Sequence, residues 1–169
     1  IVQTQGTVVF NGTDNVFDDS IIVQAEDGIT VNTDVTSSNG AITFDGDSDN
    51  NADTVDNISF SAGRALTAVT GITLDATTGG ITGAGSVSLA STNTGIIFND
   101  SATIAGATTI NADSDGDGDG VFTIAANGPI ADELCSTDLG SGEVAVAIGI
   151  DANPHFQTAF AAVLISYRK

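Results

Sequence analysis

The clearest clue to the architecture of this chain is the segment Gly71-Ile-Thr-Leu-Asp-Ala-Thr-Thr-Gly-Gly-Ile-Thr-Gly-Ala-Gly-Ser-Val-Ser-Leu-Ala90. It contains two short triplets, Ile72-Thr73-Leu74 and Val87-Ser88-Leu89, in which apolar residues flank a hydroxyl residue. Alternate residues of a β-strand point to opposite faces, so this order predicts one buried and one polar face. Glycine and aspartate, which favour turns, lie between the triplets. The segment therefore predicts short strands joined by turns.

Similar triplets recur through most of the chain, at Ile29-Thr30-Val31, Ile42-Thr43-Phe44, Ile58-Ser59-Phe60 and Ile96-Ile97-Phe98. Four successive triplets begin at Ile42, Ile58, Ile72 and Val87, which are 16, 14 and 15 residues apart. Imperfect repetition on this scale indicates a chain that coils and stacks on itself. We therefore predict an all-β fold built as a parallel β-solenoid. A β-sandwich is the alternative, although sandwiches usually have longer strands and tighter hairpins.

The repeats divide the chain into a β-solenoid body at residues 1–128 and a different tail at residues 129–169. Further strands of the body are expected at 7–10, 21–24, 103–105, 108–111 and 121–125. In the tail, residues 142–150 alternate cleanly between apolar and small or polar residues, which predicts a strand. Residues 156–167 fit either a second strand, completing a terminal hairpin, or a helical stripe. We expect this hairpin-like tail to cap the solenoid or to pair with a neighbouring subunit.

The net charge of −19 arises from 22 acidic residues against three basic ones, Arg64, Arg168 and Lys169. Nucleic-acid binding requires a basic patch, so this class of function is excluded. No apolar run is long enough to predict a membrane span. The chain opens at Ile1-Val2-Gln3 without a signal peptide or initiator Met, so we expect a mature processed protein or an excised fragment.

The first of two aspartate-rich segments, residues 45–56, has side-chain oxygens at the spacing of a looped calcium site. Counted from its first residue, they fall at positions 1, 3, 5, 7, 9 and 12. The resemblance to an EF-hand is limited to this spacing, because position 6 is Asn rather than Gly and the flanks predict strands. The predicted calcium ligands are Asp45, Asp47, Asp49, Asn51, Asp53 and Asp56. The alternative is a solvated acidic loop.

The second acidic segment places four carboxylates on alternate residues with glycines between them. Without a cation, four charges so close along the chain would repel one another strongly. Carboxylate ligands favour a hard ion, so we predict calcium here, with magnesium or a water-rich mixed site as alternatives. The predicted ligands are Asp113, Asp115, Asp117 and Asp119.

No catalytic pattern competes with these two segments. Cys135 is the only cysteine and His155 the only histidine, and no local motif links them as a nucleophile and its base. We expect Cys135 to be a buried small hydrophobe, with an intermolecular disulfide or a free thiol as alternatives. Arg64 is the only basic residue of the body, which disfavours a carbohydrate-cleaving β-helix enzyme. The chain is therefore predicted not to be an enzyme.

The composition and the triplet-and-turn pattern of residues 71–90 resemble the degenerate repeats of filamentous-haemagglutinin-type secreted bacterial adhesins. Asn39-Gly-Ala-Ile-Thr-Phe-Asp45 and Thr109-Ile-Asn-Ala-Asp-Ser-Asp115 share this pattern, and the likeness covers roughly residues 25–128. The resemblance implies a right-handed parallel β-solenoid that is extracellular, lies at the bacterial cell surface, and serves adhesion or surface display. The tail after Pro129 lies outside the resemblance.

These observations together predict a non-enzymatic, calcium-stabilised structural protein that forms a building unit of a cell-surface fibre or adhesin. Its expected partner is a second copy of the chain, joined through the chain ends into an oligomer or filament. The alternative is an adhesive module that recognises a glycan or a host surface. The features that separate these two functions are the ends and the exposed faces of the solenoid.

Overall fold

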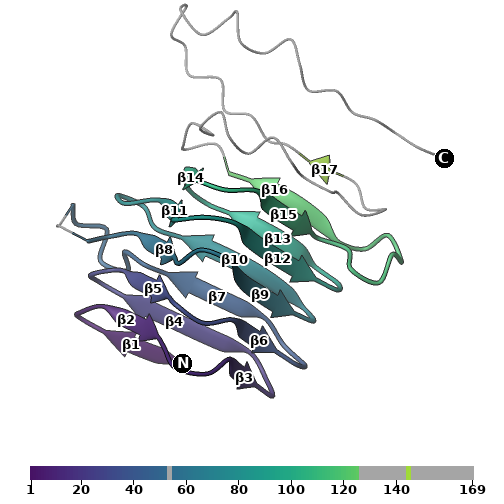
Figure 1. Ribbon diagram of the computed structural model, residues 1–169, viewed down its shortest axis with the longest axis horizontal. Helices are drawn as coiled ribbons and strands as arrows, with labels where there is room; N and C mark the ends of the chain where they lie inside the picture. The colour runs from purple at the N-terminus through teal and green to yellow at the C-terminus, as the bar shows by residue number, and fades with distance from the viewer. Residues whose placement is uncertain (53–54, 126–143, 146–169) are drawn as a thin grey trace, which may run out of the picture.

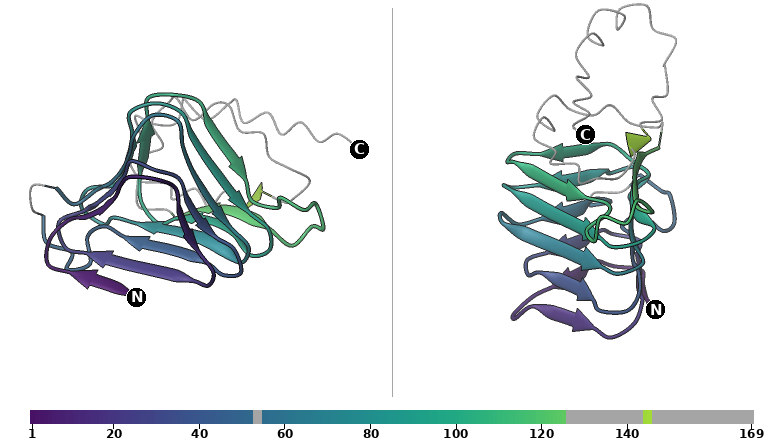
Figure 2. Two further views of the ribbon diagram at one scale, coloured as in Figure 1. Left: turned by 60° about the horizontal axis from the view of Figure 1, so that its bottom comes forward. Right: turned by 90° about the vertical axis from the view of Figure 1, so that its right-hand side faces the viewer.

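The computed structural model of the chain describes residues 1–52, 55–125 and 144–145, and within them the structure consists of short parallel strands without a helix. The chain winds through five successive coils that each add one strand to each of three sheets, and β16 (Val121–Ile124) and β17 (Val144–Ala145) then extend one of these sheets (Figures 1 and 2). This arrangement is a β-solenoid of about five coils, so the predicted all-β parallel solenoid is confirmed. Every pairing among the described strands is parallel, which distinguishes the fold from a sandwich.

The strands fall into three sheets, called here A, B and C. Sheet A contains β1 (Val2–Thr4), β4 (Ile21–Ala25), β7 (Ile42–Asp45), β10 (Gly71–Asp75), β13 (Gly95–Phe98), β16 (Val121–Ile124) and β17 (Val144–Ala145). Sheet B contains β2 (Val8–Phe10), β5 (Ile29–Val31), β8 (Ile58–Phe60), β11 (Ile81–Gly83) and β14 (Ala102–Ile104). Sheet C contains β3 (Asn15–Phe17), β6 (Val35–Ser37), β9 (Arg64–Ala68), β12 (Val87–Ser91) and β15 (Thr108–Asn111).

The length of a coil follows from the register of sheet A. Ile21 pairs with Ile42, Ile42 with Ile72, Ile72 with Ile96 and Ile96 with Phe122, so successive coils advance by 21, 30, 24 and 26 residues. The spacing of 14 to 16 residues seen in the sequence is therefore not the coil length. It arises because Ile42, Ile58, Ile72 and Val87 belong to sheets A, B, A and C. The triplets correctly predicted that the chain coils, but successive triplets lie in different sheets, so their spacing is shorter than one coil.

The core is a narrow stack of apolar side chains that point inward from all three sheets. Both apolar residues of each triplet are buried, and the residue between them is less buried, as the alternation predicted. The largest side chains include Phe44, which is fully buried and stacks on Phe10 with ring centroids 5.1 Å apart. Because strands this short cannot bury much surface alone, stability comes from stacking equivalent residues of successive coils.

Five strands were not predicted from the sequence: β1, β3, β6, β9 and β11. Several of them contain few large apolar residues, and β11 ends in Gly83. Their strand conformation is set by pairing with the coils beside them, because a parallel neighbour supplies the backbone hydrogen bonds that the local sequence does not demand.

Most of the tail lies outside the described residues, and so do Cys135, His155 and the predicted terminal hairpin. The described part of it, β17, falls within the predicted strand at 142–150 and pairs in parallel with β16. No helix long and apolar enough to cross a bilayer occurs in the parts of the chain that the structure describes.

Candidate cation sites

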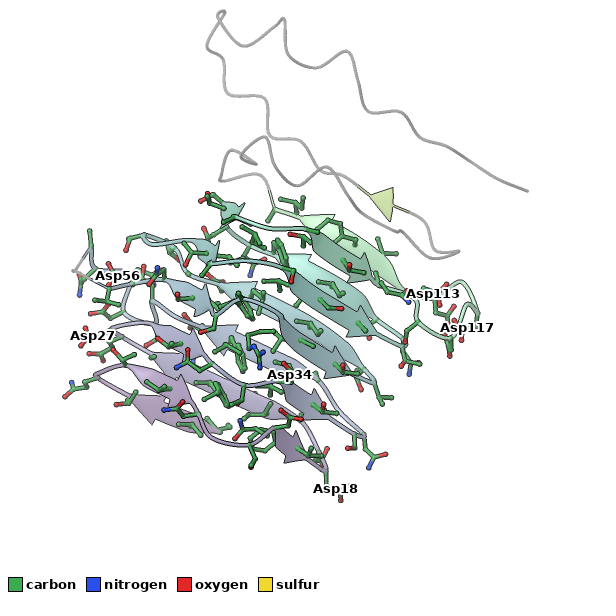
Figure 3. All side chains as sticks on the ribbon, viewed as in Figure 1. Asp18, Asp27, Asp34, Asp56, Asp113 and Asp117 are labelled. Atoms are coloured by element: carbon green, nitrogen blue, oxygen red, sulfur yellow. The ribbon has the colours of Figure 1, made fainter. Side chains whose placement is uncertain are left out.

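The two acidic segments are insertions at two different corners of the solenoid. At the corner from sheet A to sheet B, the third coil has residues 46–57 where the coils on either side have 26–28 and 76–80. At the corner from sheet C to sheet A, the fifth coil has residues 112–120 where the fourth has 92–94. Figure 3 shows Asp56 and Asp113 on opposite sides of the stack. The structure therefore separates the two segments, and each is a separate candidate site.

Among the described acids of the first acidic segment, Asp47 is the most deeply buried, with 1% of its surface exposed. Its Oδ2 accepts a hydrogen bond of 2.7 Å from the backbone N–H of Thr78, in the next coil. The Thr78 hydroxyl in turn donates to Asp56 Oδ2 at 2.9 Å, and Asp56 is also buried. Asp47 and Asp56, near the two ends of this segment, thus both bind Thr78 at the corner of the following coil.

The middle of the same segment faces solvent. Asp49 accepts hydrogen bonds from the backbone and the side-chain amide of Asn51, and both residues are exposed. These bonds lower the pKa of the Asp49 carboxyl, because they stabilise its charged form. Asn50, at the position that is Gly in an EF-hand, has a positive φ of 56°. Asp53 lies outside the described residues.

The five predicted ligands of this segment that the structure describes are consequently spread between the stack and the solvent. Among the described residues, no three acids of this loop have carboxylate oxygens within 4.8 Å of one another. A single centre that gathers all six oxygens stays a prediction.

Two acids that the sequence analysis did not single out, Asp75 and Asp100, lie at the same corner. Asp75 is the register partner of Asp45 in the next coil, and its Oδ2 accepts a 2.8 Å hydrogen bond from the Asn99 amide. Asp100 is buried, and its Oδ2 accepts a 2.9 Å hydrogen bond from Ala76 N–H. The signal was present in the sequence, because Asp45 and Asp75 each directly follow a triplet.

The electrostatics of this corner reflect burial among like charges. Burial raises the pKa of Asp45, and the neighbouring carboxylates of Asp75 and Asp47 raise it further, against opposing hydrogen bonds from Asp47 N–H and Gln24. Burial likewise raises the pKa of Asp100, again with Asp75 and Asp47 adding to the effect. The corner therefore holds acids whose ionised forms are unfavourable in the absence of a counter-ion.

The second acidic segment is more compact. One carboxylate oxygen from each of Asp113, Asp115 and Asp117 lies within 4.8 Å of the other two, the only such group among the described residues. Buried Asp113 organises the loop, because its two oxygens accept 3.1 Å hydrogen bonds from Gly116 N–H and Gly118 N–H. The fourth predicted ligand, Asp119, lies outside this group and donates its N–H to Asp117 Oδ1 at 3.0 Å.

Basic side chains offer little charge compensation to either corner. Within the described ranges Arg64 is the only basic side chain, and it pairs with Asp34 at 3.4 Å. Asp34 belongs to residues 32–34, which connect sheets B and C of the second coil, so this ion pair is at neither acidic corner. Charge at the two corners must be balanced by protons or by dissolved cations.

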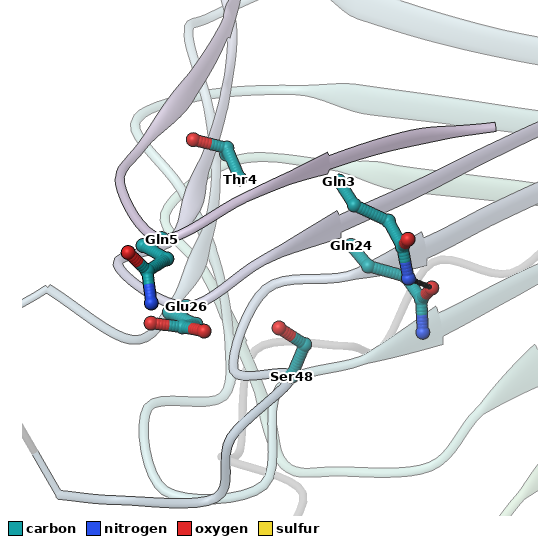
Figure 4. A pocket seen from close by; sticks show the side chains of 6 residues that line it. All are labelled: Gln3, Thr4, Gln5, Gln24, Glu26 and Ser48. Carbon is teal, nitrogen blue, oxygen red and sulfur yellow. Dashed lines mark hydrogen bonds between the residues drawn. The ribbon is translucent and has the colours of Figure 1, made fainter.

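A polar hollow of about 410 Å³ lies beside the first coils, at the end of sheet A (Figure 4). It is open to solvent, and no aromatic side chain lines it. The lining residues are Gln3, Thr4, Gln5, Gln24, Glu26 and Ser48. Gln3 and Gln24 are hydrogen-bonded to each other at 2.6 Å, so their amides are partly occupied.

Comparison with known proteins identifies no relative: no protein-family model, no curated protein and no solved structure matches the chain. The resemblance to filamentous-haemagglutinin-type repeats therefore stays a prediction.

Proposed function

We propose that this protein is a non-enzymatic structural unit of a bacterial cell-surface fibre or adhesin, that it assembles through its ends, and that calcium stabilises it. The observation that supports assembly most directly is the first coil. There β1, β2 and β3 each pair on one side only among the described residues, with β4, β5 and β6. A strand with one unpaired edge offers backbone N–H and C=O groups to another strand.

The side chains of the first coil favour a protein partner at this end. Val9 and Val16, at the centres of β2 and β3, are 50% and 66% exposed. With Ile1 and Val2 they are four of the five large hydrophobic residues exposed in the described parts of the chain. Apolar residues gathered beside open strand edges are typical of a surface that another chain covers.

The partner we propose is a second copy, which would add strand-forming residues of its tail to the open coil. Residues 142–150 have the alternation of a strand, and Arg168 and Lys169 follow them near the end of the sequence. The first coil exposes acidic residues that would attract these two cations: Asp14, Asp18 and Asp19. Opposite charges at the two joining surfaces favour head-to-tail contact between copies, which produces a filament when it does not close on itself.

Calcium would support such a fibre by stabilising each unit. A net charge of −19 makes the unit repel itself and its neighbours, and divalent ions at the two acidic corners would reduce this repulsion. An extracellular position, as the resemblance implies, would supply calcium in the concentration range at which extracellular modules bind it.

Negative-stain electron microscopy of the full chain, in calcium and after chelation, tests the proposal. We expect filaments in calcium that shorten or disassemble on chelation. The substitutions Val9→Lys and Val16→Lys should abolish them, because lysine on an edge strand opposes strand addition. The matched control is Thr67→Lys, on an exposed position of β9 that has coils on both sides, and it should assemble normally. Equal assembly by all three variants would contradict docking at the first coil.

The alternative function is an adhesive module for a glycan, and the polar hollow is the feature that favours it. Its glutamine and threonine side chains could hydrogen-bond sugar hydroxyls, although it lacks the aromatic ring on which a sugar would stack. Short rods in both conditions, together with binding on a glycan array that Gln24→Ala removes, would support this alternative over the fibre.

A further inference from the structure

We propose that Asn11, in the connection from β2 to β3, is a site of spontaneous deamidation, and that the stack of coils protects Asn39 from the same reaction. Each of the two asparagines precedes a glycine, so the dipeptides themselves do not distinguish them. A third such pair, Asn127-Gly128, lies outside the described residues. The proposal is independent of the proposed function, because it requires neither calcium nor assembly.

The reaction uses groups that the dipeptide itself carries, with water as the only co-reactant. The backbone nitrogen of the glycine loses its proton to the solvent and attacks the side-chain carbonyl carbon of the asparagine. The C–N bond of the side-chain amide then breaks and ammonia leaves, which closes a succinimide ring. Water opens this ring at either carbonyl and gives aspartate or isoaspartate. Glycine favours the attack because it has no Cβ to obstruct the close approach.

In the first coil both reacting groups of the pair are free. Asn11 and Gly12 are exposed, and a Cβ built on Gly12 would meet no heavy atom within 4 Å. Neither the Asn11 side chain nor the Gly12 N–H makes a hydrogen bond to any residue that the structure describes. The glycine nitrogen can therefore reach the side-chain carbon of Asn11 without breaking a contact of the fold.

In the connection from β6 to β7, by contrast, both reacting groups are bound, although Asn39 is itself exposed. Gly40 is buried, and its N–H donates a 3.1 Å hydrogen bond to Ser37 Oγ. Its carbonyl accepts a 3.0 Å bond from Thr70 N–H, one coil further along. The Asn39 side-chain amide donates to Asp18 Oδ1 at 2.9 Å. The attacking nitrogen and the target carbon are thus tied to different neighbours.

Close packing adds to this protection. A Cβ built on Gly40 would lie 2.3 Å from the backbone nitrogen of Ser20, so the glycine rests directly on the preceding coil. Ring closure would move the Gly40 backbone out of this contact and break its hydrogen bonds. Groups held in this way react only when the structure opens locally, which lowers their rate by the rarity of the open state. Asn39 must therefore wait for opening, whereas Asn11 need not.

The modification would change the charge of one end of the solenoid. Each event converts a neutral amide into a carboxylate on the first coil, which already exposes Asp14, Asp18 and Asp19. Isoaspartate also lengthens the backbone between β2 and β3, at a connection where no bond of Asn11 or Gly12 side chain or N–H has to be given up. The first coil is therefore where an ageing molecule gains charge, while the corner at Asn39 keeps its native chemistry.

The test is incubation of the full chain at mildly alkaline pH in water labelled with heavy oxygen, both folded and in guanidinium chloride, followed by mass spectrometry. A protease that cleaves after glutamate separates the two sites, because Glu26 lies between them. We expect Asn11 of the folded chain to deamidate nearly as fast as in denaturant and to take up one labelled oxygen. Asn39 should react about tenfold or more slowly when folded than in denaturant, because it needs local opening.

Two variants test the cause of the protection. Ser37→Ala removes the acceptor of the Gly40 N–H, and Asp18→Ala removes that of the Asn39 amide. Each should accelerate deamidation of Asn39 in the folded chain severalfold, and the unchanged rate at Asn11 is the internal control. The proposal is overturned if folded Asn11 stays intact, or if folded Asn39 reacts as fast as Asn11. Unchanged rates at Asn39 in both variants, with wild-type circular dichroism, would overturn the assigned protection.

Discussion

The two acidic corners of this solenoid have similar compositions but different physical surroundings. At the corner between sheets A and B, buried acids are hydrogen-bonded to the next coil, as Asp47 is to Thr78. At the corner between sheets C and A, Asp113 is bonded within its own loop, and Asp115 and Asp117 are exposed. Buried acids of the first corner thus connect one coil to the next. At the second corner the link to the neighbouring coil is made by Ser114, whose N–H donates a 2.9 Å hydrogen bond to the Ser91 carbonyl of the fourth coil. A run of aspartates in a sequence does not distinguish these cases.

The largest effect should come from adding a methyl group where the first corner touches its neighbour. A Cβ on Gly79 would lie 2.4 Å from the backbone of Asp56, so Gly79→Ala should destabilise the protein by about 2–3 kcal/mol through overpacking. The counterpart is Gly118→Ala, which has open space around it but a φ of +96° and should cost about 1 kcal/mol. Urea unfolding measures both. Equal losses would mean that the two corners are packed alike.

The role of Asp113 in holding the loop of the second corner can be tested by substitution. Replacing it by Asn leaves one acceptor for two backbone donors, which should cost about 1–2 kcal/mol. We expect hydrogen exchange of Gly116 and Gly118 to accelerate while the amide of Thr78, at the other corner, keeps its protection. Loss of protection at both corners would show that they are coupled through the stack.

The pH dependence of stability in chelator should have opposite signs for two acids at the corner between sheets A and B, Asp100 and Asp49. The raised pKa of Asp100 means that its folded form holds a proton more tightly than its unfolded form. The contribution of Asp100 to folding stability is therefore full below its ordinary pKa of 3.8 and is lost as the pH rises through the pKa of the folded state. The lowered pKa of Asp49 gives a contribution present above 3.8 and lost on acidification.

The sign of the pH dependence contributed by Asp100 can be measured by thermal unfolding of the wild type and of Asp100→Asn between pH 3 and pH 7, in steps of about one unit. The difference between the two proteins should move in favour of the variant as the pH rises. A difference that stays constant with pH would contradict the raised pKa. Asp49→Asn, whose difference should move the other way, is the internal control.

The smallest effect is expected where a basic residue already supplies the counter-charge. Arg64 and Asp34 are partly exposed and 3.4 Å apart, so Arg64→Gln should change the free energy of unfolding by about 0.5 kcal/mol or less. The change should be the same in calcium and in chelator. A calcium-dependent effect here would indicate that divalent ions bind acidic surfaces of this protein generally, and not at the two inserted corners.

The solenoid could be predicted from the sequence because its core alternation is local. In Ile42-Thr43-Phe44, for example, the two-residue period alone indicates which side chains are buried. The triplet spacing did not reveal the coil length, since nothing in the triplets indicates to which sheet each belongs. Strands such as β11 were missed because their conformation depends on the coils above and below.

The two candidate cation sites also differ in how far the sequence could predict them. Alternating carboxylates such as Asp113, Asp115 and Asp117 could be recognised from the sequence, because residues so close along the chain need only a turn to converge. The pairing of Asp45 with Asp75, and the hydrogen bond from Ala76 to Asp100, were decided by the tertiary structure alone, because residues this far apart in the sequence become neighbours only when coils of unequal length stack in register. Local periodicity therefore determined the architecture and one acidic loop, whereas the stacking of coils decided which distant charges share a corner.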